Sequence, residues 1–301
     1  MSPAPISPVD GPLLEVTESR TADVGGIMVR RALPRHGRRT VGAWCFADHM
    51  GPASGQGGLS IGPHPHIGLQ TVTWLFEGEV LHRDSLGSEQ PIRPGQLNLM
   101  TAGHGVSHSE EAPSGGGSRV HGMQLWVAQP SSTREGQPAF EHHAALPVAE
   151  LPGCRATVLV GALAGMRSSA RTDSDHFGAD LTIDRRTTIP IEAHHEHAVV
   201  VATGRIRIGT SVVEPGHLAY LAPGRDELPL DADVQSRLLL LGGSPFTETI
   251  SMWWNYVARS TAEISQAHAD WTARAARFGT VASPLDPIDV PPPPWTEPGG
   301  R

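Results

Sequence analysis

One segment of ten residues occurs twice in this chain of 301 residues, and the repeat limits the folds that the chain can adopt. PGQLNLMTAG at 94–103 matches PGHLAYLAPG at 215–224, with the two glycines of each copy eight residues apart. A segment typical of a β-hairpin precedes each copy, TWLFEGEV at 73–80 and VVVATGRI at 199–206. Two copies of one β-unit explain both the repeat and the length, with a junction near residue 145.

Short apolar runs between turn signals predict β-strands along most of the chain. The 34 glycines and 27 prolines favour many turns and few long helices. We therefore expect an all-β fold, either a sandwich or a barrel, and the length favours two domains over one large β-domain. The predicted strands lie at 26–30, 69–76, 96–100, 122–127, 156–160, 198–201, 218–221 and 237–241.

The C-terminal region contains one predicted helix, RSTAEISQAHADWTARAARFG at 259–279. Ser260 and Glu263 form a capping box, and Gly279 is expected to end the helix. We expect its apolar stripe to pack on a β-barrel. The stripe consists of Ile264, Ala267, Trp271, Ala275 and Phe278.

The overall charge and the cysteine content exclude several classes of protein. Thirty-one acidic residues against 23 basic ones argue against binding to nucleic acid. The two cysteines, Cys45 and Cys154, are too few for a disulfide framework and favour a reducing cytoplasm. The N-terminus lacks the pattern of a signal peptide, and no apolar run approaches the roughly 20 residues of a membrane span. We expect a cytoplasmic protein without a membrane partner.

Two short motifs carry metal-ligating residues at a spacing of two. In GPHPHIG, an extended backbone would point His64 and His66 from the same face of a strand, about 7 Å apart. In TAGHGVSHSEE, His108 and Glu110 have the same spacing, and Glu111 points to the other face. On neighbouring strands the two pairs supply three nitrogens and one carboxylate, which suits a divalent first-row metal with open positions.

A single pair of this kind is more often two solvated histidines than a metal site, and it is the second pair that favours the metal. His82, His104 and His121 lie near the motifs in the sequence. Each of these is a candidate to orient a ligand, although each equally suits an ordinary strand or surface histidine.

The second copy of the repeat lacks these ligands. Counting back from the hairpin glycine places Pro190 and Glu192 where the first copy has its HPH histidines. Counting forward from Gly224, the equivalent of Gly103, places Pro229 and Asp231 where the first copy has His108 and Glu110. We therefore expect one metal ion per chain.

A cluster of histidines in the second copy stands apart from these equivalent positions. His194, His195 and His197 surround Glu196, but no downstream pair accompanies them. We expect an exposed histidine cluster here rather than a second metal site.

The motifs together resemble the pirin family, whose members contain two cupin domains. HPHIGLQTVTWLFEGEVLHRDSLGSEQPIRPGQLNLMTAGHGVSHSEE and RVHGMQLWV look like its N-terminal signature, and WWNYVARSTAEISQAHADW looks like its C-terminal end. The resemblance spans roughly residues 20–279 and implies two tandem cupin barrels of the double-stranded β-helix (jelly-roll) type with a C-terminal helix. It places the family's metal ligands on His64, His66, His108 and Glu110. Gln70 stands where many relatives carry glutamate, which implies a different cavity polarity, and Ile67 stands where arginine is common, which implies a less basic cavity rim.

On this basis we expect three regions. Residues 15–145 should form the N-terminal barrel with the metal site, and residues 146–279 the metal-free second barrel with the helix. Residues 280–301, with their PPPP run, are too poor in apolar residues to order themselves and should form a flexible tail.

The resemblance implies two different functions. In the first, the chain is a dioxygenase of the quercetin 2,3-dioxygenase type, acting on a flavonol-like or related enediol substrate with dioxygen. Its ion would be a Lewis acid, Fe(II) in first place with nickel, copper, manganese or zinc as alternatives, and Glu110 would be the catalytic base. In the second, the chain is a metal- or redox-sensing regulator that binds a transcription regulator or a metabolic enzyme. We favour the enzyme.

Overall fold

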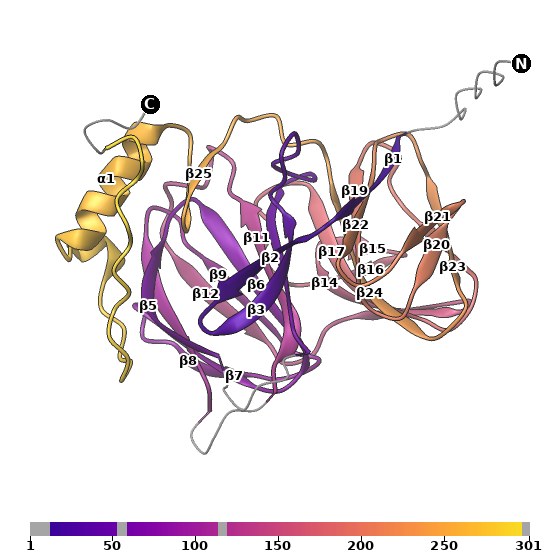
Figure 1. The fold of residues 1–301 in the computed structure, drawn as a ribbon, viewed down its shortest axis with the longest axis horizontal. Coiled ribbons are helices and arrows are strands. Elements are labelled where there is room, and N and C mark those ends of the chain that lie inside the picture. The colour runs from indigo at the N-terminus through magenta and orange to yellow at the C-terminus, as the bar shows by residue number, and fades with distance from the viewer. Residues whose placement is uncertain (1–12, 53–58, 114–118, 297–301) are drawn as a thin grey trace, which may run out of the picture.

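The computed structural model describes residues 13–52, 59–113 and 119–296. These residues form mainly β-strands, together with one α-helix, α1 (Thr261–Thr272), and a short 3-10 helix, η1 (Ala276–Phe278). The prediction of an all-β chain with a C-terminal helix is confirmed. Figure 1 shows the strands arranged as two barrels side by side, with α1 at the outer side of the first barrel.

The first barrel combines two antiparallel sheets. The large sheet contains, in spatial order, β12 (Ala139–His143), β9 (Leu97–Thr101), β6 (Leu69–Glu77), β11 (His121–Ala128), β4 (Trp44–Met50), β3 (Ile27–Leu33) and β2 (Arg20–Val24). The small sheet contains β5 (Ser60–His66), β10 (Val106–Glu111), β7 (Val80–Asp84) and β8 (Glu89–Ile92).

The second barrel repeats this arrangement. Its large sheet contains β1 (Leu14–Glu18), β22 (His217–Leu221), β19 (Glu196–Thr203), β24 (Ser236–Gly243), β17 (His176–Ile183), β14 (Cys154–Val160) and β13 (Val148–Leu151). Its small sheet contains β18 (Thr187–Pro190), β23 (Glu227–Ala232), β20 (Ile206–Ile208) and β21 (Ser211–Val213). Two hairpins complete the chain, β15 (Ala162–Leu163) with β16 (Met166–Arg167) and β25 (Ser251–Trp253) with β26 (Tyr256–Ala258).

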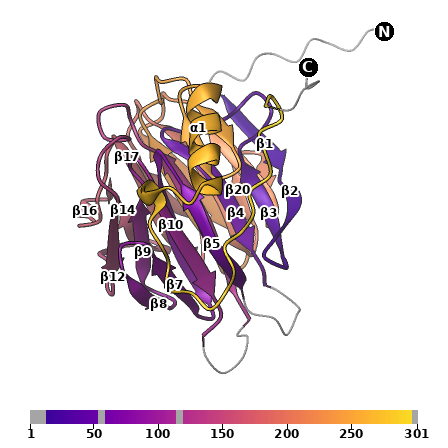
Figure 2. The same cartoon turned by 90° about the vertical axis from the view of Figure 1, so that its left-hand side faces the viewer.

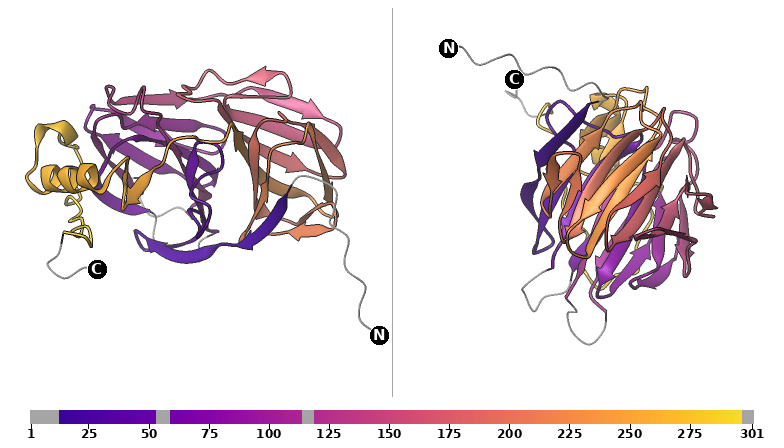
Figure 3. Two further views of the ribbon diagram at one scale, coloured as in Figure 1. Left: turned by 90° about the horizontal axis from the view of Figure 1, so that it is seen from above. Right: turned by 90° about the vertical axis from the view of Figure 1, so that its right-hand side faces the viewer.

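The first strand of the chain belongs to the second barrel. β1 pairs with β22 in antiparallel register, with Leu14 opposite Leu221 and Glu18 opposite His217. Figure 3 shows this indigo strand lying against the orange strands of the other half. The expected first barrel of residues 15–145 is therefore corrected at its start, because its sheet begins with β2. The repeat could not reveal this, since β1 precedes the first copy and covers an edge that would otherwise be unpaired.

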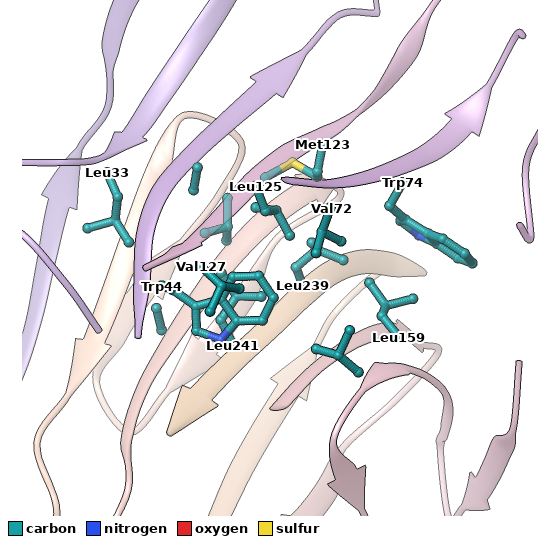
Figure 4. Packing of buried hydrophobic residues seen from close by; sticks show 14 of the residues in the cluster. Leu33, Trp44, Val72, Trp74, Met123, Leu125, Val127, Leu159, Leu239 and Leu241 are labelled. Carbon is teal, nitrogen blue, oxygen red and sulfur yellow. The ribbon is translucent and has the colours of Figure 1, made fainter. Parts of the chain in front are cut away.

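The two large sheets share one hydrophobic core. Its residues come from β3, β4, β6, β9 and β11 on one side and from β14, β19, β22 and β24 on the other. Figure 4 shows Trp44 and Val127 beside Leu241, with Trp74 near Leu159. The buried Trp74 indole N–H also donates to the Asp180 carboxylate across this junction, at 3.0 Å. The barrels are therefore held together by the apolar surface that they bury against each other, and not only by the chain that links them.

The helix begins as predicted but is shorter than predicted. The Ser260 hydroxyl accepts a hydrogen bond from the backbone N–H of Glu263. The α-helix ends at Thr272, because Arg274 adopts a left-handed φ of 56°, and Phe278 lies in η1 instead. Gly279, with a φ of 62°, ends that second helix.

The helix packs on the first barrel, although it follows the second in the sequence. Figure 2 shows α1 in front of β5 and β10. Trp271 and Phe278 share an apolar cluster with Ile67, which follows β5. The Ser107 hydroxyl of β10 donates to the Phe278 carbonyl at 2.7 Å. The helix therefore covers the outer face of the strands that carry the predicted ligands.

Residues 280–296 follow the same surface, which corrects the expectation of a flexible tail for this part of the chain. The Ile288 N–H donates to the Pro63 carbonyl at 2.8 Å, and the Trp271 indole donates to the Ile288 carbonyl at 3.0 Å. Val290 is buried in the cluster under the helix. The composition of the tail alone predicts flexibility, but apolar residues of this segment such as Val290 are buried against the helix. Residues 297–301 lie outside the described residues.

Within the described part of the chain, no helix is long and apolar enough to cross a membrane.

The shared core predicts a large difference between two leucine substitutions. Leu239→Ala should lower the free energy of unfolding by about 2–5 kcal/mol, because Leu239 is fully buried between the sheets. Leu86→Ala is the matched control and should change it by no more than about 0.5 kcal/mol, because Leu86 is 44% exposed. Urea unfolding followed by tryptophan fluorescence measures both. We expect a single transition, and two separate transitions would show that the barrels do not depend on a common core.

Candidate metal centre

Three histidines from two neighbouring strands meet inside the first barrel. β5 and β10 are antiparallel, with His64 directly opposite His108 and with His66 two residues further along β5. One ring nitrogen of each histidine lies within 4.8 Å of the other two. All three side chains are buried. The strand period of two therefore brings these predicted ligands together.

Hydrogen bonds fix the ring orientation of two of these histidines. Nδ1 of His64 lies 2.8 Å from the Gly62 carbonyl and donates to it, which leaves Nε2 with a free lone pair. Nδ1 of His108 lies 3.3 Å from Nδ1 of His82, whose Nε2 lies 3.0 Å from the Asp84 carboxylate. This chain of contacts places the His108 proton on Nδ1 and directs its Nε2 lone pair into the cluster.

The donor set fits a divalent transition-metal ion. Nε2 of His66 and Nε2 of His108 face each other at 3.0 Å, an arrangement that a cation between the two lone pairs stabilises. Burial lowers the pKa of His64 to about 4, and it lowers the pKa of His66 and His108 well below the ordinary value. The three imidazoles are thus neutral at pH 7, as metal ligation requires.

Glu110 lines the same cavity as the three histidines. The register of β10 shifts between His108 and Glu110, so Glu110 lies opposite Ile61. Burial raises the pKa of Glu110 to about 7, although a hydrogen bond with Thr73 acts in the opposite direction. Among the described residues, its carboxylate is not part of the group of donor atoms that converge within 4.8 Å.

Glu111 points away from the cavity, as the alternation of a strand predicts. Its carboxylate pairs with Arg83 and accepts hydrogen bonds from the hydroxyls of Ser109 and Ser283, each at 2.7 Å. The contact with Ser283 attaches the C-terminal segment to β10.

A cavity of about 380 Å³ opens at the histidines, and its wall includes the aromatic side chains of Phe46, Trp126 and Trp254. Phe46 and Trp126 stack with ring centroids 3.9 Å apart and planes 14° apart. The Arg31 guanidinium lies 4.6 Å from the centre of the Phe46 ring and pairs with both oxygens of Asp48, at 2.8 and 2.7 Å. Trp254, at the turn between β25 and β26, stands edge-on to His64. The volume lies within the roughly 300–1,000 Å³ that is usual for small-molecule sites.

Sequence reasoning missed most of these wall residues. Arg31, Phe46 and Asp48 come from β3 and β4, where no motif marks them, and Trp254 comes from a hairpin about 190 residues after His64. Gln124 and Trp126 carried a detectable signal, because HGMQLW places them two residues apart on one strand.

Only one of the three candidate orienting histidines contacts a ligand. His82 is the one that contacts His108. His121 instead faces His49, with Nε2 atoms 2.9 Å apart, and His104 lies on a turn where Nδ1 contacts the Gly136 carbonyl at 3.0 Å.

The positions equivalent to the HPH histidines in the second barrel differ from those predicted. In the strand pairing, Pro190 lies opposite Glu227 and Thr188 opposite Pro229. Thr188 and Pro190, rather than Pro190 and Glu192, are therefore the equivalents. The count failed because residues 191–195 connect β18 to β19, whereas only residues 67–68 connect β5 to β6. The corrected positions carry no metal-ligating side chain.

The histidine cluster of the second barrel is not uniformly exposed, which corrects the prediction. His194 is largely exposed, but His195 and His197 are buried. Successive side chains of β19 point alternately into the second barrel and into the shared core. Both faces of the strand are therefore covered at its start.

Comparisons with known proteins agree with this architecture. The Pirin family matches residues 26–127, and the Pirin C-terminal cupin domain matches residues 177–279. A Pseudomonas aeruginosa protein named "Putative quercetin 2,3-dioxygenase" is 46% identical over 289 residues, which cover 94% of this chain and 91% of that protein. The two matching domains confirm the prediction of tandem cupin barrels.

Two solved structures are also similar. The crystal structure of quercetin 2,3-dioxygenase from Acinetobacter baumannii has a TM-score of 0.90 at 38% identity, and the match covers 96% of this chain and 98% of that one. A bacterial pirin from Escherichia coli in complex with nickel(II) has a TM-score of 0.61 at 19% identity, covering 77% of this chain and 100% of that one. The second likeness shows the fold alone.

Removing one histidine should remove the ion without unfolding the barrel. His108→Ala should contain about one equivalent of metal less than the wild type by elemental analysis, while its circular dichroism spectrum stays that of the wild type, because β10 also packs on an apolar core. His104→Ala, on the neighbouring turn, should keep its metal. Unfolding of His108→Ala would mean that the ion is structural.

The buried Glu110 carboxyl predicts a pH-dependent difference in the stability of the metal-free protein. The folded chain holds this proton up to a pH of about 7, whereas the unfolded chain releases it near the ordinary value of 4.5. Unfolding is therefore increasingly favoured as the pH rises between these values. Glu110→Gln should be more stable than the wild type by about 2–3 kcal/mol above pH 7, with the difference disappearing towards pH 4.5.

Urea unfolding of both chelator-treated proteins, at several pH values from about 5 to 8, measures this difference. A difference that does not vary with pH would show that Glu110 titrates as an ordinary carboxyl group.

Proposed function

The chain belongs to the pirin family, and we propose that it is a metal-dependent dioxygenase acting on a flavonol-like, quercetin-type substrate or a related enediol. The observation that supports this most directly is the cavity itself, which has three aromatic side chains in its wall and ends at the three buried histidines. A site that only held a structural ion would not need an open cavity of this size beside it.

We propose that Nε2 of His64, His66 and His108, together with the Glu110 carboxylate, would hold one divalent ion. Fe(II) is the proposed ion, with nickel, copper, manganese and zinc as alternatives, because imidazole and carboxylate ligands suit all of them. When bound, the ion supplies a Lewis acid for the substrate oxygen and a centre at which dioxygen and the substrate meet.

The cavity walls suit a planar aromatic substrate. Stacking on the exposed side of the Phe46 and Trp126 pair would orient a flavonol ring towards the histidines. Arg31 is neutralised by Asp48, so the wall recognises a neutral polyphenol better than a free anion. The aromatic side chains of the cavity wall exclude water. The lower local dielectric strengthens polar contacts at the end of the cavity near the histidines.

Glu110 is placed to accept the substrate proton. The buried Glu110 carboxyl lines the cavity beside the histidines, and the enolic hydroxyl of a flavonol is the proton donor in this class of reaction. Thr73 contacts the Glu110 carboxyl group, and the Thr73 hydroxyl donates to the Gln124 amide oxygen at 3.0 Å. The overall reaction adds both atoms of dioxygen to the substrate, opens its heterocycle and releases carbon monoxide.

The test is oxygen uptake by protein reconstituted anaerobically with iron, nickel, copper or manganese, over a panel of flavonols. The wild type should consume dioxygen with at least one metal. Glu110→Gln keeps the shape but removes the base, so its turnover should fall by about 100-fold or more, further than its metal occupancy. Glu150→Gln, the same change at an exposed position of the second barrel, should retain full activity.

Two results would count against the proposal. If the turnover of Glu110→Gln falls only in proportion to the metal lost, Glu110 is not the base. If no metal supports oxygen uptake and the loaded protein instead captures a partner in a metal-dependent way, the regulatory function is the better explanation.

A further inference from the structure

A second group of metal-ligating side chains lies at one end of the large sheet of the second barrel. The sheet order there is β19, β24 and β17, and Gly243 of β24 pairs with both Glu196 of β19 and His176 of β17. Each of these three residues ends its strand at the same edge of the sheet. The three residues that adjoin them outside the sheet therefore lie beside one another. These residues are His195, Ser244 and Asp175.

Hydrogen bonds hold two of these side chains in place. The Ser244 hydroxyl donates to the Asp175 carboxylate at 2.5 Å, and the Ser244 N–H donates to the Asp175 carbonyl at 3.0 Å. The His195 N–H donates to the Glu192 carbonyl at 3.0 Å, and the buried His195 ring lies nearly parallel to that of Phe177. Asp175 and His195 are therefore positioned before any ligand binds, which reduces the entropy lost on binding.

Two of the three distances between the donor atoms are close to those of a tetrahedral site. Nε2 of His195 lies 2.9 Å and Nε2 of His194 lies 3.2 Å from the same Asp175 carboxylate oxygen, and all three atoms lie within 4.8 Å of one another. Ligands at about 2.0–2.1 Å from a tetrahedral ion are separated by about 3.3–3.4 Å, so small shifts would seat an ion. We propose that Asp175, His194 and His195 form a second divalent metal site, suited to zinc, nickel or copper.

This site differs from the first in position and in coordination. It lies on the connection 191–195, which is longer than its counterpart at residues 67–68, and not inside a barrel. His194 and Asp175 are 62% and 59% exposed in their side chains, so the fourth position opens to solvent. An ion here would join the start of β17 to the turn before β19. This point is next to the barrel junction, where the Gly42 N–H donates to the Glu196 carboxylate at 2.8 Å.

The test removes the first site and titrates the second with zinc. In the chelator-treated double variant His66→Ala, His108→Ala, isothermal titration calorimetry should show one equivalent of zinc bound. Adding His194→Ala or Asp175→Asn to this background should weaken binding by about 100-fold or more, because each removes one ligand. His268→Ala, on the helix at the other end of the molecule, is the matched histidine control and should leave the affinity unchanged.

A second measurement covers the case in which the double variant does not fold. The wild type should then bind two equivalents of zinc and His194→Ala only one, and zinc in excess should raise the thermal midpoint of the wild type more than that of His194→Ala. If neither protein binds a second equivalent, or if His194→Ala binds zinc as the wild type does, the histidines serve only as hydrogen-bond partners of Asp175 and the proposal is wrong.

Discussion

The core between the two large sheets is the interaction on which the remaining structure depends. Strand β11 places alternate side chains into this core and into the cavity, so the packing of one face fixes the position of the other. Val72 and Trp74 pack between the barrels, while Thr73 between them contacts Glu110. The cavity wall is therefore as rigid as the core behind it, which is what a site that orients a planar substrate requires.

The outer side of the site depends on a different part of the chain. The helix α1 and residues 280–296 cover β5 and β10, and the Ser107 hydroxyl on β10 donates to a carbonyl of this region. Buried between this cover and the large sheet, the three histidines lose contact with water and stay neutral. The segment after the second barrel thus supports a site whose three histidines lie in the first barrel, and it contributes Trp254, Asn255 and Ile288 to the cavity wall.

The sequence predicts the features that depend on local spacing. The repeat predicted two barrels with equivalent strand order, the i and i+2 spacing predicted that His64, His66 and His108 converge, and the capping box predicted where α1 begins. Each of these follows from strand or helix periodicity and from a turn residue such as Gly103, so a few neighbouring positions are enough to determine them.

The features that the sequence did not predict depend on contacts between distant segments. The pairing of β1 with β22, the binding of residues 280–296 to the helix, and the wall formed by Arg31, Phe46 and Trp254 all join parts of the chain far apart in sequence. The residues of the second barrel that are equivalent to the HPH histidines were predicted wrongly for a related reason. The connection between their strand and the next is longer in the second barrel, and this shifts any count made along the chain.

In the proposed function, the histidines and Glu110 hold an ion that meets a flavonol in this cavity. A crystal structure of the Fe(II)-loaded protein, grown without oxygen in the presence of a flavonol, tests it most directly. We expect the ion on His64, His66, His108 and Glu110, with the flavonol hydroxyl directed at it and the ring against Trp126. An ion held without Glu110, or a flavonol bound away from this cavity, would contradict the account.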